Sequence, residues 1–216
     1  MTWSEIKIAI TTIYGQYVGS GKIIDDTDNG STPSPLAILV GLVHNRISGV
    51  PIELNCLKET GTITLTGATT YNLRTLLPGL KTVFQIYGIN QNQEHPNYGN
   101  AEANITPLDG WTVRGDSLVF TGVAPTSGTV TIQYKSKYMV KNSAGTRQLY
   151  FLAEDDYSVL DDDDSNVLIF GVGEFLNWYS DSESQDRRKE VKDWFKEAWE
   201  NLMLSNKVSR SLDSML

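Results

Sequence analysis

The stretch EDDYSVLDDDDSNVLIFGVGEFLNWY, residues 154–179, is where the sequence changes from one kind of pattern to another. Its first part, 154–164, holds seven acidic residues and no Lys or Arg. After this run, apolar residues recur at spacings of three and four, as they do on one face of a helix. Acidic and hydroxyl side chains just before a helix interact favourably with its free N–H groups. The stretch therefore predicts a helix over 165–179 that is capped by Asp164 or Ser165.

The same helical spacing of apolar residues marks both ends of the chain. It predicts further helices over residues 3–18, 36–47 and 184–206. The first of these helices is expected to start near Thr2 and the second near Ser34 or Thr32. Before the last one, Ser182 and Gln185 stand in capping-box spacing. Two helices at each end of the chain cannot each bury an apolar face alone, so we expect all four to pack into one bundle.

Between the helices the apolar residues alternate with polar ones, which is typical of strands with one buried face. The runs with this alternation are 53–59, 62–66, 82–87, 111–122, 129–138 and 147–152. The sequence thus predicts an α+β protein, in which an antiparallel β-sandwich or small barrel (51–163) is inserted into a helical bundle domain (1–50 with 164–216). The loops 19–33 and 90–104 lack apolar periodicity, and we expect them to be mobile.

The last two predicted helices carry a wide aromatic stripe. Its helical spacing favours a core or a contact between subunits over a platform on which ligands stack. The residues expected at such a subunit interface are Trp178, Tyr179, Trp194, Phe195 and Trp199.

Composition and charge exclude several classes of protein. A net charge of −8 argues against a protein that grips nucleic-acid phosphates through a basic face. The longest apolar run, 35–43, is too short to cross a bilayer, and the first residues do not resemble a secretory signal. The single cysteine, Cys56, excludes an intramolecular disulfide framework and is expected to be buried.

No pattern in the sequence indicates catalysis or a bound metal. The two histidines, His44 and His95, belong to no recognisable catalytic motif. A calcium loop that begins at Asp161 would need Gly at its sixth position and an acid at its twelfth, where the chain has Asn166 and Val172. We therefore expect no enzyme activity, no cofactor and no metal. One or two acids suffice to cap a helix, so the surplus acids are expected to face a channel or a partner; they are Glu154, Asp155, Asp156, Asp161, Asp162 and Asp163.

The stretch PLAILVGLVHNRISGVPIELNCLKETGTITLTGATTYNLRTLLPGLKTVFQIYG (35–88) resembles the head-to-tail connector, or adaptor, proteins of tailed bacteriophages. In that family a helix is followed by a strand, a short hairpin and a strand that ends near an aromatic–Gly pair. The corresponding residues here are Leu65, Tyr71, Leu73, Leu77, Pro78, Val83, Tyr87 and Gly88. The segment 163–179 also resembles the polar turn and helix of the adaptors of short-tailed phages. The chain departs from the family in the Asn-rich loop 90–104 and in SDSES (180–184), where the family has basic residues.

The resemblance implies a structural virion protein. Its copies, about twelve of them, would form a ring below the portal, connect head to tail and extend the DNA channel. The implied partners are other copies of the chain, the portal protein, tail or further neck proteins, and passing double-stranded DNA bound without sequence specificity. The implied location is the head–tail junction of the virion, and the host cytoplasm during assembly. An acidic channel would repel phosphate and so ease the passage of DNA.

A second hypothesis remains open. The β part could be a carbohydrate- or surface-binding module of a tail fibre or adhesin, with its Asn- and Thr-rich loops binding the ligand. The helices at both ends of the chain count against it, since a simple lectin sandwich does not need them.

Overall fold

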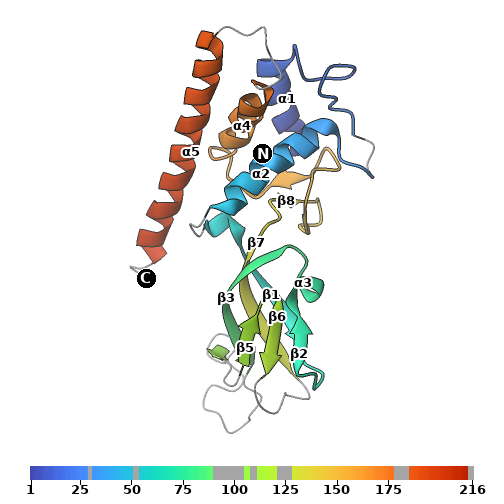
Figure 1. Cartoon of the computed structure of the whole chain (residues 1–216), viewed down its shortest axis with the longest axis vertical. Helices are drawn as coiled ribbons and strands as arrows, with labels where there is room; N and C mark the ends of the chain where they lie inside the picture. Colours follow the sequence, from blue (N-terminus) through green and yellow to red (C-terminus); the bar gives the residue numbers. More distant parts are fainter. Residues whose placement is uncertain are drawn as a thin grey trace. The chain divides into compact units, whose positions relative to one another are not determined.

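The computed structural model describes residues 1–28, 31–50, 54–89, 105–107, 111–120, 128–177 and 185–213. The chain divides into a helical unit, Met1–Leu57 with Lys137–Leu216, and a β unit, Lys58–Ser136. Figure 1 labels elements of both units. The structure combines helices with antiparallel sheets, so the α+β class expected from the sequence is confirmed. The β unit is smaller than the expected 51–163, because 137–163 belongs with the helices.

The helical unit contains α1 (Trp3–Tyr14), α2 (Pro35–Gly49), α4 (Asn166–Leu176) and α5 (Gln185–Asp213). The first two helices begin where the sequence predicts. At the start of α1, the Thr2 hydroxyl and the Glu5 carboxylate form a capping box. At the start of α2, the Ser34 hydroxyl accepts a hydrogen bond from the Ala37 N–H at 3.2 Å. The last helix continues to Asp213, beyond the expected end at residue 206.

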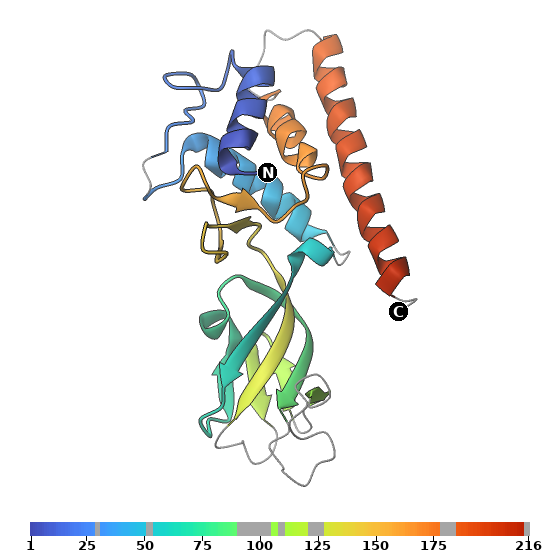
Figure 2. The ribbon, with the colours of Figure 1, turned by 180° about the vertical axis from the view of Figure 1, so that it is seen from behind.

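All four helices contribute to one hydrophobic core, as predicted. α4 contacts α1, α2 and α5, and it lies between α1 and α5 in both views (Figures 1 and 2). Two glycines of α4 allow this close packing. A Cβ at Gly171 would lie 2.7 Å from Val43 Cγ1 of α2, and a Cβ at Gly173 would overlap the Tyr14 hydroxyl of α1.

Short strands complete the helical unit, where the sequence predicts longer ones. A 3-10 helix (Asn55–Leu57) replaces the first half of the expected strand 53–59, because the Leu57 N–H bonds to the Leu54 carbonyl at 3.0 Å. Of the expected strand 147–152, only β9 (Arg147–Gln148) forms. It joins β8 (Val140–Lys141) and β10 (Tyr157–Ser158) in an antiparallel sheet of order β10-β8-β9.

The β unit consists of two small antiparallel sheets around a second core. One sheet has the order β1-β7-β3-β4, and its strands are Lys58–Thr64, Thr129–Ser136, Leu80–Ile89 and Ile105–Pro107. The other has the order β2-β6-β5, with strands Thr70–Asn72, Ser117–Phe120 and Trp111–Arg114, and a short helix α3 (Leu73–Leu76) follows β2. Buried residues of both sheets, such as Ile132 and Leu118, share the core. Within the described ranges, neither sheet closes into a barrel.

Candidate functional site

The acids that the sequence singles out lie in the loops that lead from β9 to α4, and they differ in their surroundings. Asp156 is buried. Its Oδ2 accepts hydrogen bonds from Gln148 Nε2 at 2.5 Å and from the backbone N–H groups of Leu152 and Ala153 at 2.6 and 2.9 Å. Its carbonyl accepts from the Trp3 N–H at 2.6 Å. The expectation that Asp156 faces a channel or partner is therefore wrong, because its carboxylate instead fixes the turn that follows β9.

The other five acids remain exposed, although two of them also have partners within the chain. Glu154 forms an ion pair with Lys7 of α1. Asp162 accepts from the N-terminal ammonium at 2.6 Å while its side chain stays 82% exposed. Asp155, Asp161 and Asp163 are exposed as well. These five exposed carboxylates lie in two short segments on either side of β10, and together we call them the acidic loop.

The start of α4 differs from the prediction. Ser165 occupies the capping position, but its hydroxyl donates to the Asp161 carbonyl at 2.9 Å and caps no N–H group. The Asp164 carboxylate accepts from the Ser205 hydroxyl of α5 at 3.1 and 3.2 Å. Burial, followed by the charges of Asp161 and Asp163, raises the pKa of Asp164, and the bond from Ser205 opposes this shift. The predicted side-chain cap is thus absent, because both candidate groups are bonded elsewhere.

The aromatic set predicted at a subunit interface is only partly described, since Trp178 and Tyr179 lie outside the described residues. Phe195 is buried, and Trp194 and Trp199 are half-buried. The Arg46 guanidinium of α2 lies 4.9 Å from the Phe195 ring centre and 5.7 Å from that of Trp199. Phe195 and Trp199 therefore help to hold α5 against α2, and the two half-buried tryptophans keep part of their surface accessible.

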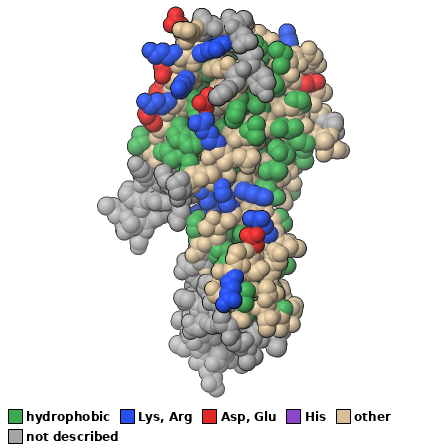
Figure 3. Space-filling model, viewed as in Figure 1, with side chains coloured by type: hydrophobic (Ala, Val, Ile, Leu, Met, Phe, Trp, Pro, Cys, Tyr) green, Lys and Arg blue, Asp and Glu red, His purple; other side chains and the backbone are tan. Residues whose placement is uncertain are grey.

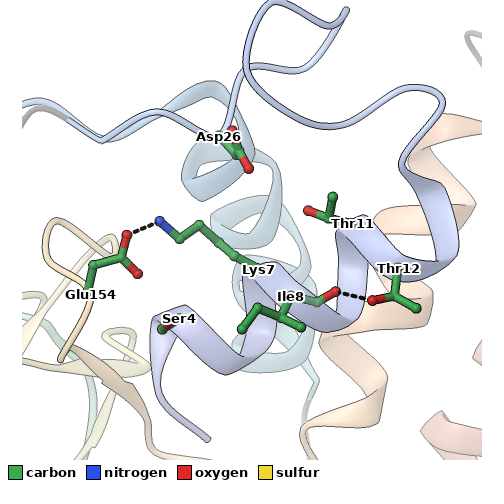
Figure 4. A pocket seen from close by; sticks show the side chains of 7 residues that line it. All are labelled: Ser4, Lys7, Ile8, Thr11, Thr12, Asp26 and Glu154. Carbon is green, nitrogen blue, oxygen red and sulfur yellow. Dashed lines mark hydrogen bonds and ion pairs between the residues drawn. The ribbon is translucent and has the colours of Figure 1, made fainter.

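A hollow lies along the outer side of α1 (Figure 4). The residues that line it are Ser4, Lys7, Ile8, Thr11, Thr12, Asp26 and Glu154. The side chain of Lys7 extends from α1 toward Glu154 in the figure. Its ammonium group also donates a hydrogen bond to Asp28 Oδ2 at 2.9 Å. Asp28 accepts from Trp3 Nε1 at 2.7 Å too, so this part of the loop 19–33 is held against α1. The sequence did not predict that anchor, because Asp28 has no local signal that links it to α1.

His44 is buried and Cys56 is half-buried, although the sequence predicts a buried Cys56, and the surroundings of both disfavour chemistry. Burial lowers the pKa of His44 to about 3, and neither ring nitrogen has a hydrogen-bond partner among the described residues. Burial raises the pKa of the Cys56 thiol to about 11, which disfavours the reactive thiolate. In the part of the chain that the structure describes, no three His, Cys, Asp or Glu residues are arranged to hold a metal ion. His95 lies outside that part.

Comparisons with known proteins do not assign the chain to a family. No protein-family model matches the sequence, and no curated protein is similar enough to be reported as a relative. None of the described helices is long and apolar enough to cross a membrane.

Proposed function

We propose that the protein is a structural component of the virion of a tailed bacteriophage. Its copies form a ring below the portal, connect the head to the tail and extend the DNA channel. The observation that carries this proposal is the architecture itself. Both ends of the chain build one helical unit around one core, and the β unit is inserted between α2 and β8.

The residues that resemble the connector proteins occupy positions that support the proposal. Leu65, Tyr71, Leu73 and Leu77 are all buried in the core of the β unit. The Tyr71 hydroxyl also accepts from the Thr66 N–H at 2.7 Å, which joins the end of β1 to β2. These four residues of the shared pattern therefore belong to the core of the β unit.

The acidic loop supports a role near DNA that does not involve gripping it. Three of its exposed carboxylates, those of Asp155, Asp161 and Asp163, form no ion pair within the described residues. Such a surface repels phosphates, and the repulsion weakens as salt rises. A ring that DNA must pass through benefits from this property.

The test is to prepare phage particles from a genome in which the coding sequence is interrupted. We expect DNA-filled heads without attached tails, and we expect the intact protein, supplied in trans, to restore tails. Particles with normal tails would contradict the proposal. A defect confined to adsorption, together with glycan binding by the purified chain, would instead favour the fibre or adhesin hypothesis.

A further inference from the structure

β1 (Lys58–Thr64) is an edge strand of the β unit. Among the described residues it pairs only with β7, the yellow strand beside the teal β1 in Figure 2. It has seven residues, whereas the other edge strands of the three sheets, β2, β4, β5, β9 and β10, have two to four. Proteins commonly protect an exposed edge with a short strand, a bulge, a proline or charged side chains. Past Lys58 and Glu59, β1 has none of these protections, since its register with β7 is unbroken.

The backbone of β1 presents free hydrogen-bonding groups along this edge. The Leu65 N–H, just after the strand, bonds to the Gly128 carbonyl at 2.8 Å. In an antiparallel pair the direction of these groups alternates from one residue to the next. The N–H and carbonyl groups of Thr60, Thr62 and Thr64 therefore point away from β7, and none of them bonds to another described residue.

The surroundings of this edge leave it open. Thr60, Thr62 and Thr64 are all exposed. The free edge ends at Thr66, whose N–H donates to the Tyr71 hydroxyl at 2.7 Å. On the face seen in Figure 3, hydrophobic side chains are scattered over the described surface of the β unit, whereas they gather over the helical unit. The edge of β1 thus offers a partner hydrogen bonds rather than an apolar surface.

An edge of this kind binds an extended strand, because a strand places N–H and carbonyl groups opposite its own at every second residue. The partner strand must itself have a free edge of similar length. In the described part of the chain β1 is the edge strand that has one, since β4, for example, is three residues long and its Pro107 has no N–H. We propose that two copies of the chain associate by pairing β1 with β1, antiparallel about a two-fold axis at Thr62.

The sequence of the strand suits this register. Thr62 lies opposite Thr62 of the second copy, and Thr60 lies opposite Thr64 on either side of the axis. These pairs form about six backbone hydrogen bonds, two for each pair. Neighbouring threonines on adjacent strands also interact favourably. Lys58 and Glu59 lie beyond the paired stretch, opposite uncharged residues of the second copy, so no like charges face each other.

The pairing goes beyond the ring proposed above. The subunits of a ring all point in the same direction along its axis, whereas this two-fold axis turns two copies in opposite directions. The pair therefore belongs to the free protein and not to neighbours within one ring. It covers an edge that would otherwise be open to aggregation.

The first experiment removes an outward N–H. Thr62→Pro deletes the donors at the centre of the contact but leaves the bonds between β1 and β7, because the Thr62 N–H points outward. Self-association of the full chain is measured by sedimentation equilibrium at concentrations up to millimolar. We expect the wild type to dimerise reversibly and Thr62→Pro to weaken the dimer by at least about tenfold. Circular dichroism and thermal melting check that the variant is folded.

Charged variants test the register without changing the backbone. In Thr62→Lys, and likewise in Thr62→Glu, two like charges face each other across the axis, so each variant alone should dimerise about threefold more weakly at low salt. A mixture of the two should dimerise at least as well as the wild type, since opposite charges then face each other. Gln133, which is exposed on the same face but belongs to β7, gives the matched control. The same two substitutions there should change dimerisation little, alone or mixed.

The outcomes decide between occupants of the edge. A wild-type chain that stays monomeric at millimolar concentration would overturn the pairing. So would a folded Thr62→Pro variant that dimerises like the wild type, or a mixture of the Lys and Glu variants that dimerises no better than either alone. If phage that carry Thr62→Pro lose their tails while the wild-type chain is monomeric, β1 pairs with a strand of another virion protein, and pairing between copies is overturned. None of these results decides whether particles that lack the protein lose their tails.

Discussion

At the residue scale, Asp156 shows how one acid of an acidic run differs from its neighbours. Its carboxylate is buried and accepts from one side-chain and two backbone donors, which come from Gln148, Leu152 and Ala153. Replacing it with Ala should destabilise the protein by about 2–4 kcal/mol, because the buried donors lose a charged acceptor. Urea unfolding measures the change.

The adjacent Asp155 is the matched control, since it is exposed. The Asp155→Ala variant should unfold within about 0.5 kcal/mol of the wild type. Equal losses for both variants would show that the buried bonds of Asp156 do not stabilise the turn.

His44 predicts a particular pH dependence of stability. Burial lowers its pKa in the folded chain to about 3, whereas the unfolded chain takes up the proton near the ordinary value of 6.5. Protonation therefore favours unfolding, and stability is constant above about pH 6.5 and falls by up to about 1.4 kcal/mol per pH unit below it. The His44→Leu variant should lose this component between about pH 7 and pH 5, while His95→Gln should keep it. Identical slopes for His44→Leu and the wild type in urea titrations would refute the assignment.

Sequence reasoning at this scale succeeds where the interaction is local. The helix starts near Thr2 and near Ser34 or Thr32 could be predicted, because a residue that caps a helix bonds to a partner only three residues away. The bond between Trp3 and Asp28 was not predicted, because it joins segments that only the folded chain brings together. The burial of Asp156 was missed although its three donors lie only three to eight residues away, because nothing in the acidic run distinguishes this residue from its exposed neighbours.

At the scale of elements, α4 depends on its glycines. A methyl group at Gly171 would lie 2.7 Å from Val43 Cγ1 and 3.1 Å from Phe195 Cε2. Val43 is β-branched and stiff, so Gly171→Ala should cost about 1–3 kcal/mol despite the better helix propensity of Ala. At Gly49, near the end of α2, an added methyl meets nothing within 4 Å. The same substitution there should therefore be neutral or stabilising. Thermal unfolding of both variants tests the difference, and a stabilised Gly171→Ala variant would show that α4 has room to move.

The long elements were predictable and the short ones were not. A helical period extends over many residues, so all four long helices were placed within a few residues of their ends, apart from the C-terminal end of α5. Strands of two residues, such as β8 and β10, carry no period at all. Their pairing depends on the surrounding helical unit, which also explains why 137–163 was assigned to the β part.

At the scale of the whole molecule, the acidic loop distinguishes a bound ion from a repulsive surface. If Asp161–Asp163 held calcium, a chelator would lower the melting temperature, because a ligand that binds only the folded state stabilises it. We expect no change with chelator. The variant with all three aspartates changed to Asn should remain folded, since the ion pair that these acids form within the described residues, Met1–Asp162, has an 82% exposed aspartate.

The same triple variant should interact more strongly with double-stranded DNA at low salt, because it presents less negative charge to the phosphates. Filter binding at about 20 mM and 150 mM salt compares it with the wild type. A melting temperature that falls with chelator and returns with calcium, or DNA binding that is identical for both proteins, would contradict a repulsive role for these acids.

The ring is the central claim, and averaged electron micrographs of the isolated head–tail vertex test it most directly. Particles that carry a tagged form of this chain would be compared with untagged ones. We predict extra density at every position of a closed ring directly below the portal, one tag per subunit. Tag density that is absent from the vertex, or that is present only on the fibres, would contradict the account.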